Sequence, residues 1–408
     1  QLDEIDLAVH VGSGNVWKRE DGAFETRRAI EVGRRVAHDV SLAVQAPESH
    51  NAREDLARRP LRAVTQQEDG SPHASGPPSG RVSANGRHVV FASYSPLVPA
   101  DGNTTRDIYV MDVSTRRVTL ETPGAAGRPA NGESMNPDIS RDGRYVVFES
   151  IAGNLTDVEF VRGIPRVFLR DRQTGVIRLL STNASGEPAN GPSMNPAISG
   201  DGDSVAFTSS ADDLLEEPGV PGGSIGVYLI RLASKERMRV DVTSQRHVRA
   251  GQSAFPAISR DGRYVAFMSK ADLTCRDGSC RADDVQDDNG VFDIYVHDTI
   301  MGQTRRVSQG HSKRDSDGPS YHPAISGDGR FVAFVSEASK LTHGGSGRVA
   351  QIYVRNLETG TMEIISHGAT GRPANAGSAR PAVSGDGSVI AYQSLASNLL
   401  CEDKFGQS

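Results

Sequence analysis

A unit of about sixty residues that recurs along this 408-residue chain limits its fold more than any other feature. The stretch 136–148 reads Asn-Pro-Asp-Ile-Ser-Arg-Asp-Gly-Arg-Tyr-Val-Val-Phe, and a weaker copy spans 79–91 with Asn-Gly in place of Asp-Gly. Four further copies begin at Asn195, Phe255, His322 and Arg380. The serine that closes the short apolar stretch of each copy returns every 57 to 67 residues. Such a period indicates an array of equivalent supersecondary units.

Each unit predicts four strands. A short strand of the type Pro-Ala-Ile-Ser leads into Asp-Gly, a dipeptide that favours a tight hairpin turn, and the second strand is rich in aromatic and β-branched residues. A third strand such as 293–296 and a fourth that ends at Ser308 complete the unit. The apolar spacing has period two, which excludes a helical solenoid. We therefore predict an all-β fold, a six-bladed β-propeller with four-stranded antiparallel blades that start near 79, 136, 195, 255, 322 and 380.

The last unit supplies only two strands before the chain ends, so the ring needs strands from elsewhere. Residues 39–44 resemble a third strand and residues 61–65 resemble a fourth. We expect residues 38–65 to complete the last blade by pairing with residues 379–395, which leaves no exposed seam. The propeller domain then spans 38–408, and residues 1–37 form an N-terminal extension, an arm, an extra strand or a short helix. The alternative is an incomplete last blade with a loose N-terminal tail.

Charge and cysteine content narrow the class of protein. The net charge is −6 and no basic stripe is visible, which argues against a nucleic-acid partner. No apolar run is long enough for a transmembrane helix. Cys275 and Cys280 are placed for a small disulfide loop, which suits an oxidising compartment. We therefore expect a periplasmic or extracellular location.

The repeat also resembles a known family. The pattern Pro-x-Ile-Ser-x-Asp-Gly-Arg-Tyr-Val-Ala-Phe-x-Ser, seen at 256–269, is similar to the PD40 repeat, the WD40-like unit of TolB-like β-propellers. The resemblance covers about residues 60–395. It implies a propeller fold, an export to the periplasm or beyond, and a platform for binding more than a catalyst, because this repeat serves several unrelated functions.

One set of residues varies while its neighbours repeat. The residue before the proline of each first strand is Ser79 in the weak copy and then Asn136, Asn195, Phe255, His322 and Arg380. First strands of propeller blades lie innermost, so these side chains should face one mouth of the central channel. His322 and Arg380 would lie on adjacent blades and could grip a carboxylate. We interpret the five as ligand-binding residues; the alternative is a solvated channel lining.

Two acidic loops share a spacing. Asp101, Asn103 and Asp107 recur as Asp287, Asn289 and Asp293. Oxygen ligands at these intervals suit Ca²⁺, so we consider a calcium site that stiffens the loop. The alternative is a turn in which Asp and Asn side chains cap backbone groups.

The function that the sequence favours is non-enzymatic. We predict a binding or scaffold propeller that contacts a protein or a cell-surface polysaccharide, as one subunit of a larger assembly. The alternative is a glycoside hydrolase or polysaccharide lyase that uses residues at the channel mouth. No nucleophile elbow or phosphate loop is present. A catalyst should gather two or more buried groups with shifted pKa values in the channel, whereas a binder should not.

Overall fold

The computed structural model describes residues 6–11, 80–157, 162–216, 224–249, 251–274, 289–310, 316–342, 348–368 and 371–399. Within these ranges the chain is all-β apart from a 3-10 turn, η2 (Ala125–Gly127). Five sheets have four antiparallel strands and one has three. We number these sheets as blades 1 to 6 in chain order. No helix in the described ranges is long and apolar enough to cross a membrane.

The blades follow the predicted order of strands. Blade 1 contains β2 (Gly80–Val82), β3 (His88–Ser93), β4 (Asp107–Asp112) and β5 (Val118–Leu120). Blade 2 contains β6 (Ser134–Ile139), β7 (Tyr145–Ser150), β8 (Arg166–Asp171) and β9 (Val176–Leu179). Blade 3 contains β10 (Ser193–Ile198), β11 (Ser204–Ser209), β12 (Gly226–Arg231) and β13 (Arg237–Arg239). Blade 4 contains β14 (Ser253–Ile258), β15 (Tyr264–Ser269), β16 (Asp293–Asp298) and β17 (Gln303–Arg306). Blade 5 contains β18 (Ser320–Ile325), β19 (Phe331–Ser336), β20 (Gln351–Asn356) and β21 (Met362–Ile364). Blade 6 contains β22 (Ser378–Val383), β23 (Val389–Ser394) and β1 (Asp6–Val11).

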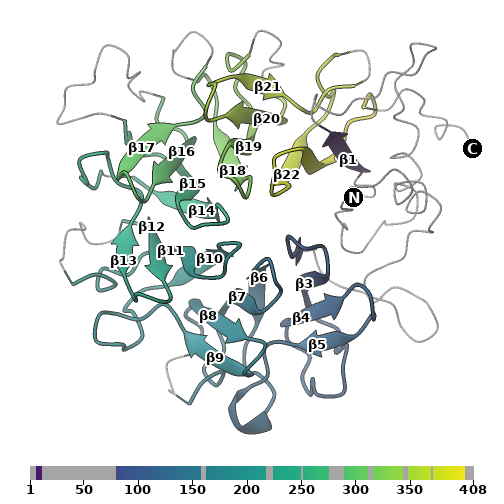
Figure 1. Cartoon of the computed structure of the whole chain (residues 1–408), viewed down its shortest axis with the longest axis vertical. Helices are drawn as coiled ribbons and strands as arrows, with labels where there is room; N and C mark the ends of the chain where they lie inside the picture. Colours follow the sequence, from purple (N-terminus) through teal and green to yellow (C-terminus); the bar gives the residue numbers. More distant parts are fainter. Residues whose placement is uncertain are drawn as a thin grey trace, which may run out of the picture.

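The blades are set around a common centre (Figure 1), with β6, β10, β14, β18 and β22 nearest to it and the fourth strands at the rim. The innermost strands of consecutive blades contact one another. This radial arrangement of antiparallel sheets is that of a β-propeller. The prediction of a propeller built from four-stranded antiparallel blades is confirmed by this topology.

The core lies between the sheet faces. In each complete blade an aromatic residue of the second strand stacks on one of the third, with ring centroids 5.6 to 6.2 Å apart. The pairs are Phe91–Tyr109, Phe148–Phe168, Phe207–Tyr228, Phe267–Tyr295 and Phe334–Tyr353. All ten rings are at least 98% buried. A blade alone would leave these faces in water, so the sheets stabilise each other by stacking.

The Asp-Gly repeat forms the hairpin that the sequence predicted. In blade 2 the Ser140 hydroxyl donates to Asp142 at 2.6 Å, and the backbone N–H of Tyr145 donates to Ser140 Oγ at 3.0 Å. Gly143 lies at φ 78°, a conformation that favours glycine. The repeated Ser and Asp side chains therefore hold the turn between first and second strands.

The last blade differs from the expectation. The edge of β23 pairs with β1, with Asp6 opposite Ser394 and Val11 opposite Val389. The strand beside β23 thus comes from the region assigned to an N-terminal extension, and not from residues 38–65, which lie outside the described residues. The six-residue run Asp-Leu-Ala-Val-His-Val of β1 alternates weakly and matches no repeat, so the repeat comparison could not single it out.

Candidate functional site

The five predicted mouth residues share one backbone conformation. Their φ values are 48° (Asn136), 52° (Asn195), 53° (Phe255), 51° (His322) and 52° (Arg380). At each of them the pairing of first and second strands shifts register, as at Ala254/Ala257 in blade 4. Each is therefore the left-handed residue of a β-bulge, a position that glycine usually takes. In blades 2 to 6 the first strand begins two residues before the predicted start because it continues through the bulge.

The left-handed conformation has an energetic consequence. This conformation destabilises a residue that has a Cβ by about 1 kcal/mol, yet each of these positions carries a full side chain. A proline follows each one, so the next residue has no N–H for the strand ladder. The same local geometry therefore presents five side chains of four types on the innermost strands.

Two mouth residues are joined through a buried glutamate. Asn136 Nδ2 donates to Glu149 Oε1 at 3.0 Å, and the backbone N–H of Asn195 donates to Glu149 Oε2 at 2.6 Å. Glu149 is 7% exposed, and burial raises the pKa of its carboxyl group while the two hydrogen bonds oppose that rise. The asparagines therefore belong to a joint between blades 2 and 3.

The other three form an arc over blades 4, 5 and 6. The Phe255 and His322 rings meet edge to face at 5.1 Å, and the Tyr321 ring contacts His322 in the same manner at 5.4 Å. Burial, then Arg380 and Arg81, lower the pKa of His322. His322 is thus a neutral ring near two guanidinium groups. It would bind a carboxylate by donating a hydrogen bond and not by adding a positive charge.

Sequence reasoning missed two charged residues on the innermost strands. Asp138 occupies the position that is alanine in blades 3 to 6, and Arg81 occupies it in blade 1. Burial raises the pKa of Asp138 and Arg81 opposes this rise. Asp138 accepts the N–H of Ile198 at 3.0 Å and so also bonds blade 2 to blade 3. Departure from a repeated alanine was the signal that could have identified both residues.

The first acidic loop uses its oxygens within the protein. Asp101 accepts from the Asn103 N–H and from the Tyr109 hydroxyl, and Asn103 Oδ1 accepts from the N–H and hydroxyl of Thr105. Asp107 accepts from Thr122 Oγ1 at 2.6 Å. These contacts match the capping alternative.

The second acidic loop is partly visible. Asn289 Nδ2 donates to Asp293 at 2.9 Å, and Arg306 lies 3.6 Å from the same carboxylate. An arginine therefore already neutralises the charge that Ca²⁺ would need. Asp287, Cys275 and Cys280 lie outside the described residues. No group of three or more His, Cys, Asp or Glu side chains in the described ranges is placed to hold a metal ion.

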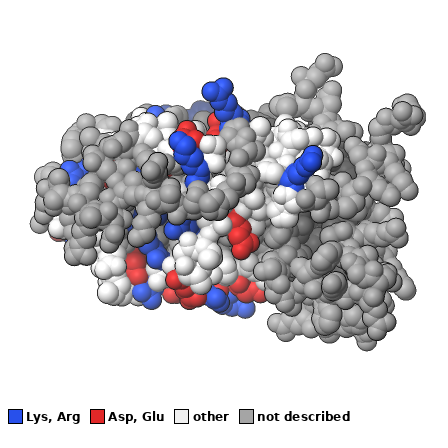
Figure 2. Space-filling view, turned by 90° about the horizontal axis from the view of Figure 1, so that it is seen from above, with Lys and Arg blue, Asp and Glu red and all other residues white. Residues whose placement is uncertain are grey.

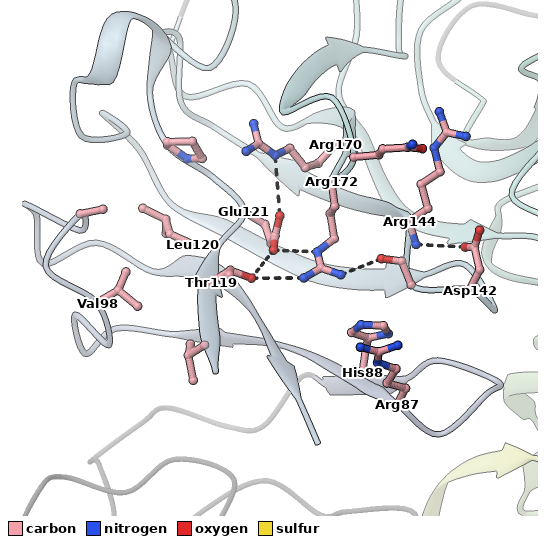
Figure 3. Close-up of a pocket in the computed structure, with 15 residues that line it drawn as sticks. Arg87, His88, Val98, Thr119, Leu120, Glu121, Asp142, Arg144, Arg170 and Arg172 are labelled. Atoms are coloured by element: carbon pink, nitrogen blue, oxygen red, sulfur yellow. Dashed lines mark hydrogen bonds and ion pairs between the residues drawn. The ribbon is translucent and has the colours of Figure 1, made fainter. Parts of the chain in front are cut away.

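A groove of about 770 Å³ separates blades 1 and 2 at their rim (Figure 3). Arg172 spans it by donating to Glu121 at 2.9 Å, to the Gly143 carbonyl at 2.7 Å and to Thr119 at 3.3 Å. Glu121 also lies 3.7 Å from Arg170. The two remaining arginines of the lining, Arg87 and Arg144, pair with Asp112 and Asp171. Positive charges in this groove are matched by carboxylates, as in a structural joint.

Comparison with known proteins adds the following. No family model and no curated protein matches the chain. Among solved structures it is similar to a TolB protein from Agrobacterium tumefaciens (18% identity, 82% of this chain and 92% of that one, TM-score 0.47). It is also similar to TolB from Acinetobacter baumannii (16% identity, 76% and 64%, TM-score 0.42). A third is the oligogalacturonate lyase from Vibrio parahaemolyticus (11% identity, 78% and 88%, TM-score 0.37).

TolB proteins therefore appear among the structural neighbours, in agreement with the resemblance of the repeat. At these identities and TM-scores the likeness carries no conclusion on function, and the fold assignment depends on the strand pairing described above.

Proposed function

We propose that the chain is a non-enzymatic binding propeller of six blades, closed by its N-terminal strand, that works in the periplasm or outside the cell. Its ligand is a protein or a cell-surface polysaccharide, held at the axial mouth formed by the first strands. The resemblance of the repeat to TolB-like propellers supports a binding propeller, and the residues before the first-strand prolines support the axial mouth as the binding site.

The observation that carries the proposal is the set of five left-handed bulges. Regular strands would fold equally well with glycine there, and glycine would avoid the conformational cost. Non-glycine residues in this conformation are more frequent at functional positions. Here the backbone repeats and the side chains differ, as expected when one ligand contacts several blades in different ways.

The competing enzyme hypothesis has a specific observation in its favour. Asp138, Glu149 and His322 have shifted pKa values near the axis, which is the cluster expected of a catalyst. However, both carboxylates accept backbone N–H groups from blade 3. A group held in a joint between blades is poorly placed to exchange a proton with a substrate, so we favour binding.

The test uses the full chain and a His322→Ala/Arg380→Ala double variant. A glycan array and cross-linking to native surface extracts are run side by side, with Arg178→Ala on rim strand β9 as the control. We expect a saturable ligand that the double variant loses and that the control retains. Equal capture by all three proteins would contradict the proposal.

Turnover separates the two functions. Acidic and neutral polysaccharides are incubated with the chain and their reducing ends or unsaturated products are measured. We expect no turnover. Product formation that disappears in Asp138→Asn or Glu149→Gln would replace the binding function with an enzymatic one.

A further inference from the structure

The innermost strands place three rows of residues along the axis. The mouth row holds the five bulge residues. The middle row, two positions further along each strand, is Arg81, Asp138, Ala197, Ala257, Ala324 and Ala382. The turn row, directly before each Asp-Gly or Asn-Gly, is Ala84, Arg141, Gly200, Arg260, Gly327 and Gly385.

The net charge of these three rows is opposite in sign to the net charge of the whole chain. The three rows contain four arginines (Arg81, Arg141, Arg260 and Arg380) and one carboxylate (Asp138), which gives +4 − 1 = +3 with His322 neutral. The full sequence has a net charge of −6. Elsewhere basic and acidic side chains are mixed, as the described part of the face in Figure 2 shows. The three rows are therefore more basic than the chain as a whole, although an aspartate follows the turn row in blades 2 to 6.

Three of these arginines are open to a ligand. Arg81, Arg141 and Arg260 are exposed, and none of them forms an ion pair within the described residues. Burial and the positive charges of Arg81 and Arg380 disfavour a proton on His322. Like charges therefore repel one another at this position, although Asp138 also interacts with Arg81. An anion at the axis would relieve that repulsion.

Arg260 shows that a guanidinium group reaches across the turn end. Its Nη2 lies 2.9 Å from where a Cβ would stand at Gly385 of blade 6, and its Cγ lies 2.8 Å from that position at Gly200 of blade 3. A side chain at either glycine would displace this arginine. The glycines of the turn row thus leave room for a cation from blade 4 to extend over the turns of blades 3 and 6.

Carbon surface accompanies the charge at the mouth. Phe255 is 38% exposed although it is a large apolar residue, and its ring contacts His322. An inorganic anion would gain nothing from this ring, whereas an organic acid would bury its carbon skeleton against it.

We infer that the mouth binds a small organic polycarboxylate, with one carboxylate between Arg380 and Arg81, a hydrogen bond from His322, and the carbon skeleton against Phe255. Arg260 and Arg141 lie at the turn end, each followed by an aspartate, and contribute less. The inference rests on the proposed binding function: a small polycarboxylate would occupy the same mouth as the protein or polysaccharide, through carboxylate groups of the kind that this ligand would present. The fork of each guanidinium matches two carboxylate oxygens.

Isothermal titration with tricarballylate tests the inference. We expect saturable binding that weakens as salt is raised. Because a hydrogen bond to a charged group is worth more than a neutral one, Arg81→Gln and Arg380→Gln should each weaken it about tenfold or more. Phe255→Ala should weaken it less, and Arg178→Gln on the rim should leave it unchanged. The neutral triamide of the same acid and inorganic phosphate serve as comparison ligands.

Each alternative outcome contradicts the inference in a recognisable way. Equal affinity for phosphate and tricarballylate would remove the role of Phe255 and the organic class. Binding that Arg178→Gln weakens as much as Arg81→Gln would indicate attraction to surface charge alone. Absence of tricarballylate binding, with capture of the glycan or protein ligand retained in the assay above, would overturn the anion class while the binding function stands.

Discussion

At the scale of single residues, two buried aspartates at equivalent positions differ in their partners. Asp293 begins β16 in blade 4 and lies 3.6 Å from Arg306, whereas Asp107 begins β4 in blade 1. The register places Arg306 opposite Tyr295 and Leu120 opposite Tyr109, so blade 1 has leucine where blade 4 has arginine. Asp107 is 1% exposed, and burial raises its pKa to about 6.

Because blade 1 lacks this arginine, we expect an Asp-to-Asn substitution to stabilise the protein at Asp107 and to destabilise it at Asp293. The folded protein keeps the Asp107 proton up to about pH 6, whereas the unfolded chain loses it near 3.8. The free energy of unfolding therefore falls as pH rises from about 4 to 6, by roughly 3 kcal/mol at about 1.4 kcal/mol per pKa unit. Asp107→Asn should flatten this dependence and stabilise the protein at pH 7. Urea unfolding between pH 4 and 8 measures it.

Asp293→Asn is the matched comparison. It leaves Arg306, which is 6% exposed, without its carboxylate, so we expect a loss of about 3 kcal/mol or more at pH 7. Equal destabilisation by both substitutions would mean that the arginine of blade 4 does not distinguish the two sites.

At the scale of strands, the junctions between blades 2 and 3 and between blades 3 and 4 share one kind of contact. The residue after the second-strand phenylalanine accepts the N–H of the bulge residue in the next blade: Glu149 from Asn195 at 2.6 Å and Thr208 from Phe255 at 3.3 Å. In blades 4 and 5 that position is Met268 and Val335, neither of which has a side-chain oxygen to accept the hydrogen bond. The bulges of blades 3 and 4 are therefore tied to the preceding blade by side chains.

Glu149 variants test this joint. In Glu149→Gln, the new side-chain oxygen can still accept the Asn195 N–H, and its NH2 group can donate to Asn136 once the Asn136 amide has flipped. The substitution also removes a buried carboxyl group whose pKa is raised. We expect its free energy of unfolding at pH 7 to stay within about 1 kcal/mol of the native protein. Glu149→Ala leaves the Asn195 N–H without its acceptor and should cost about 1 to 3 kcal/mol.

The comparison of the two variants in denaturant unfolding, with Thr208→Val as a second joint, checks the expectation. Because the Thr208 contact is longer and neutral, its loss should cost less than that of Glu149→Ala. Equal stability of Glu149→Ala and the native protein would show that the contact does not join the blades.

Sequence patterns predicted elements better than they predicted contacts. The Ser-x-Asp-Gly turn and the period-two strands are local, so residues 140–148 were enough to foresee the hairpin. The variation before each proline singled out five residues but did not indicate their positive φ, because an Asn, Phe, His or Arg is ordinarily extended in a strand. The burial of Asp138 and Glu149 comes from their packing against blade 3. Such packing between repeats could not be predicted from the sequence of a single repeat.

At the scale of the whole molecule, backbone hydrogen bonds link the inner turns in sequence. The Arg141 N–H donates to the Gly200 carbonyl at 3.0 Å, the Asp201 N–H to Arg260 at 2.9 Å and the Asp328 N–H to Gly385 at 3.0 Å. These bonds couple blades that are neighbours in the chain. In blade 6, β1 pairs with β23, so residues near the start of the sequence meet residues near its end. In the proposed closed ring, this strand would have a distinct role in holding the last blade in place.

Cross-linking tests that role directly. In β1, Val9 faces Ala391 of β23, and antiparallel neighbours are close enough for a disulfide. In a background with Cys275, Cys280 and Cys401 changed to Ser, Val9→Cys/Ala391→Cys should oxidise readily and run as a cross-linked species on non-reducing gels. Val9→Cys/Gln393→Cys, displaced by two residues in the register, is the control and should oxidise poorly. Because the bond would tether the two ends of the chain, the chain-entropy account predicts roughly 4 to 6 kcal/mol of added stability, lost again on reduction. Equal oxidation of both pairs, or efficient cross-linking of Ala391→Cys to a cysteine within residues 39–44 in its place, would return the closing strand to the segment that the repeat pattern first suggested.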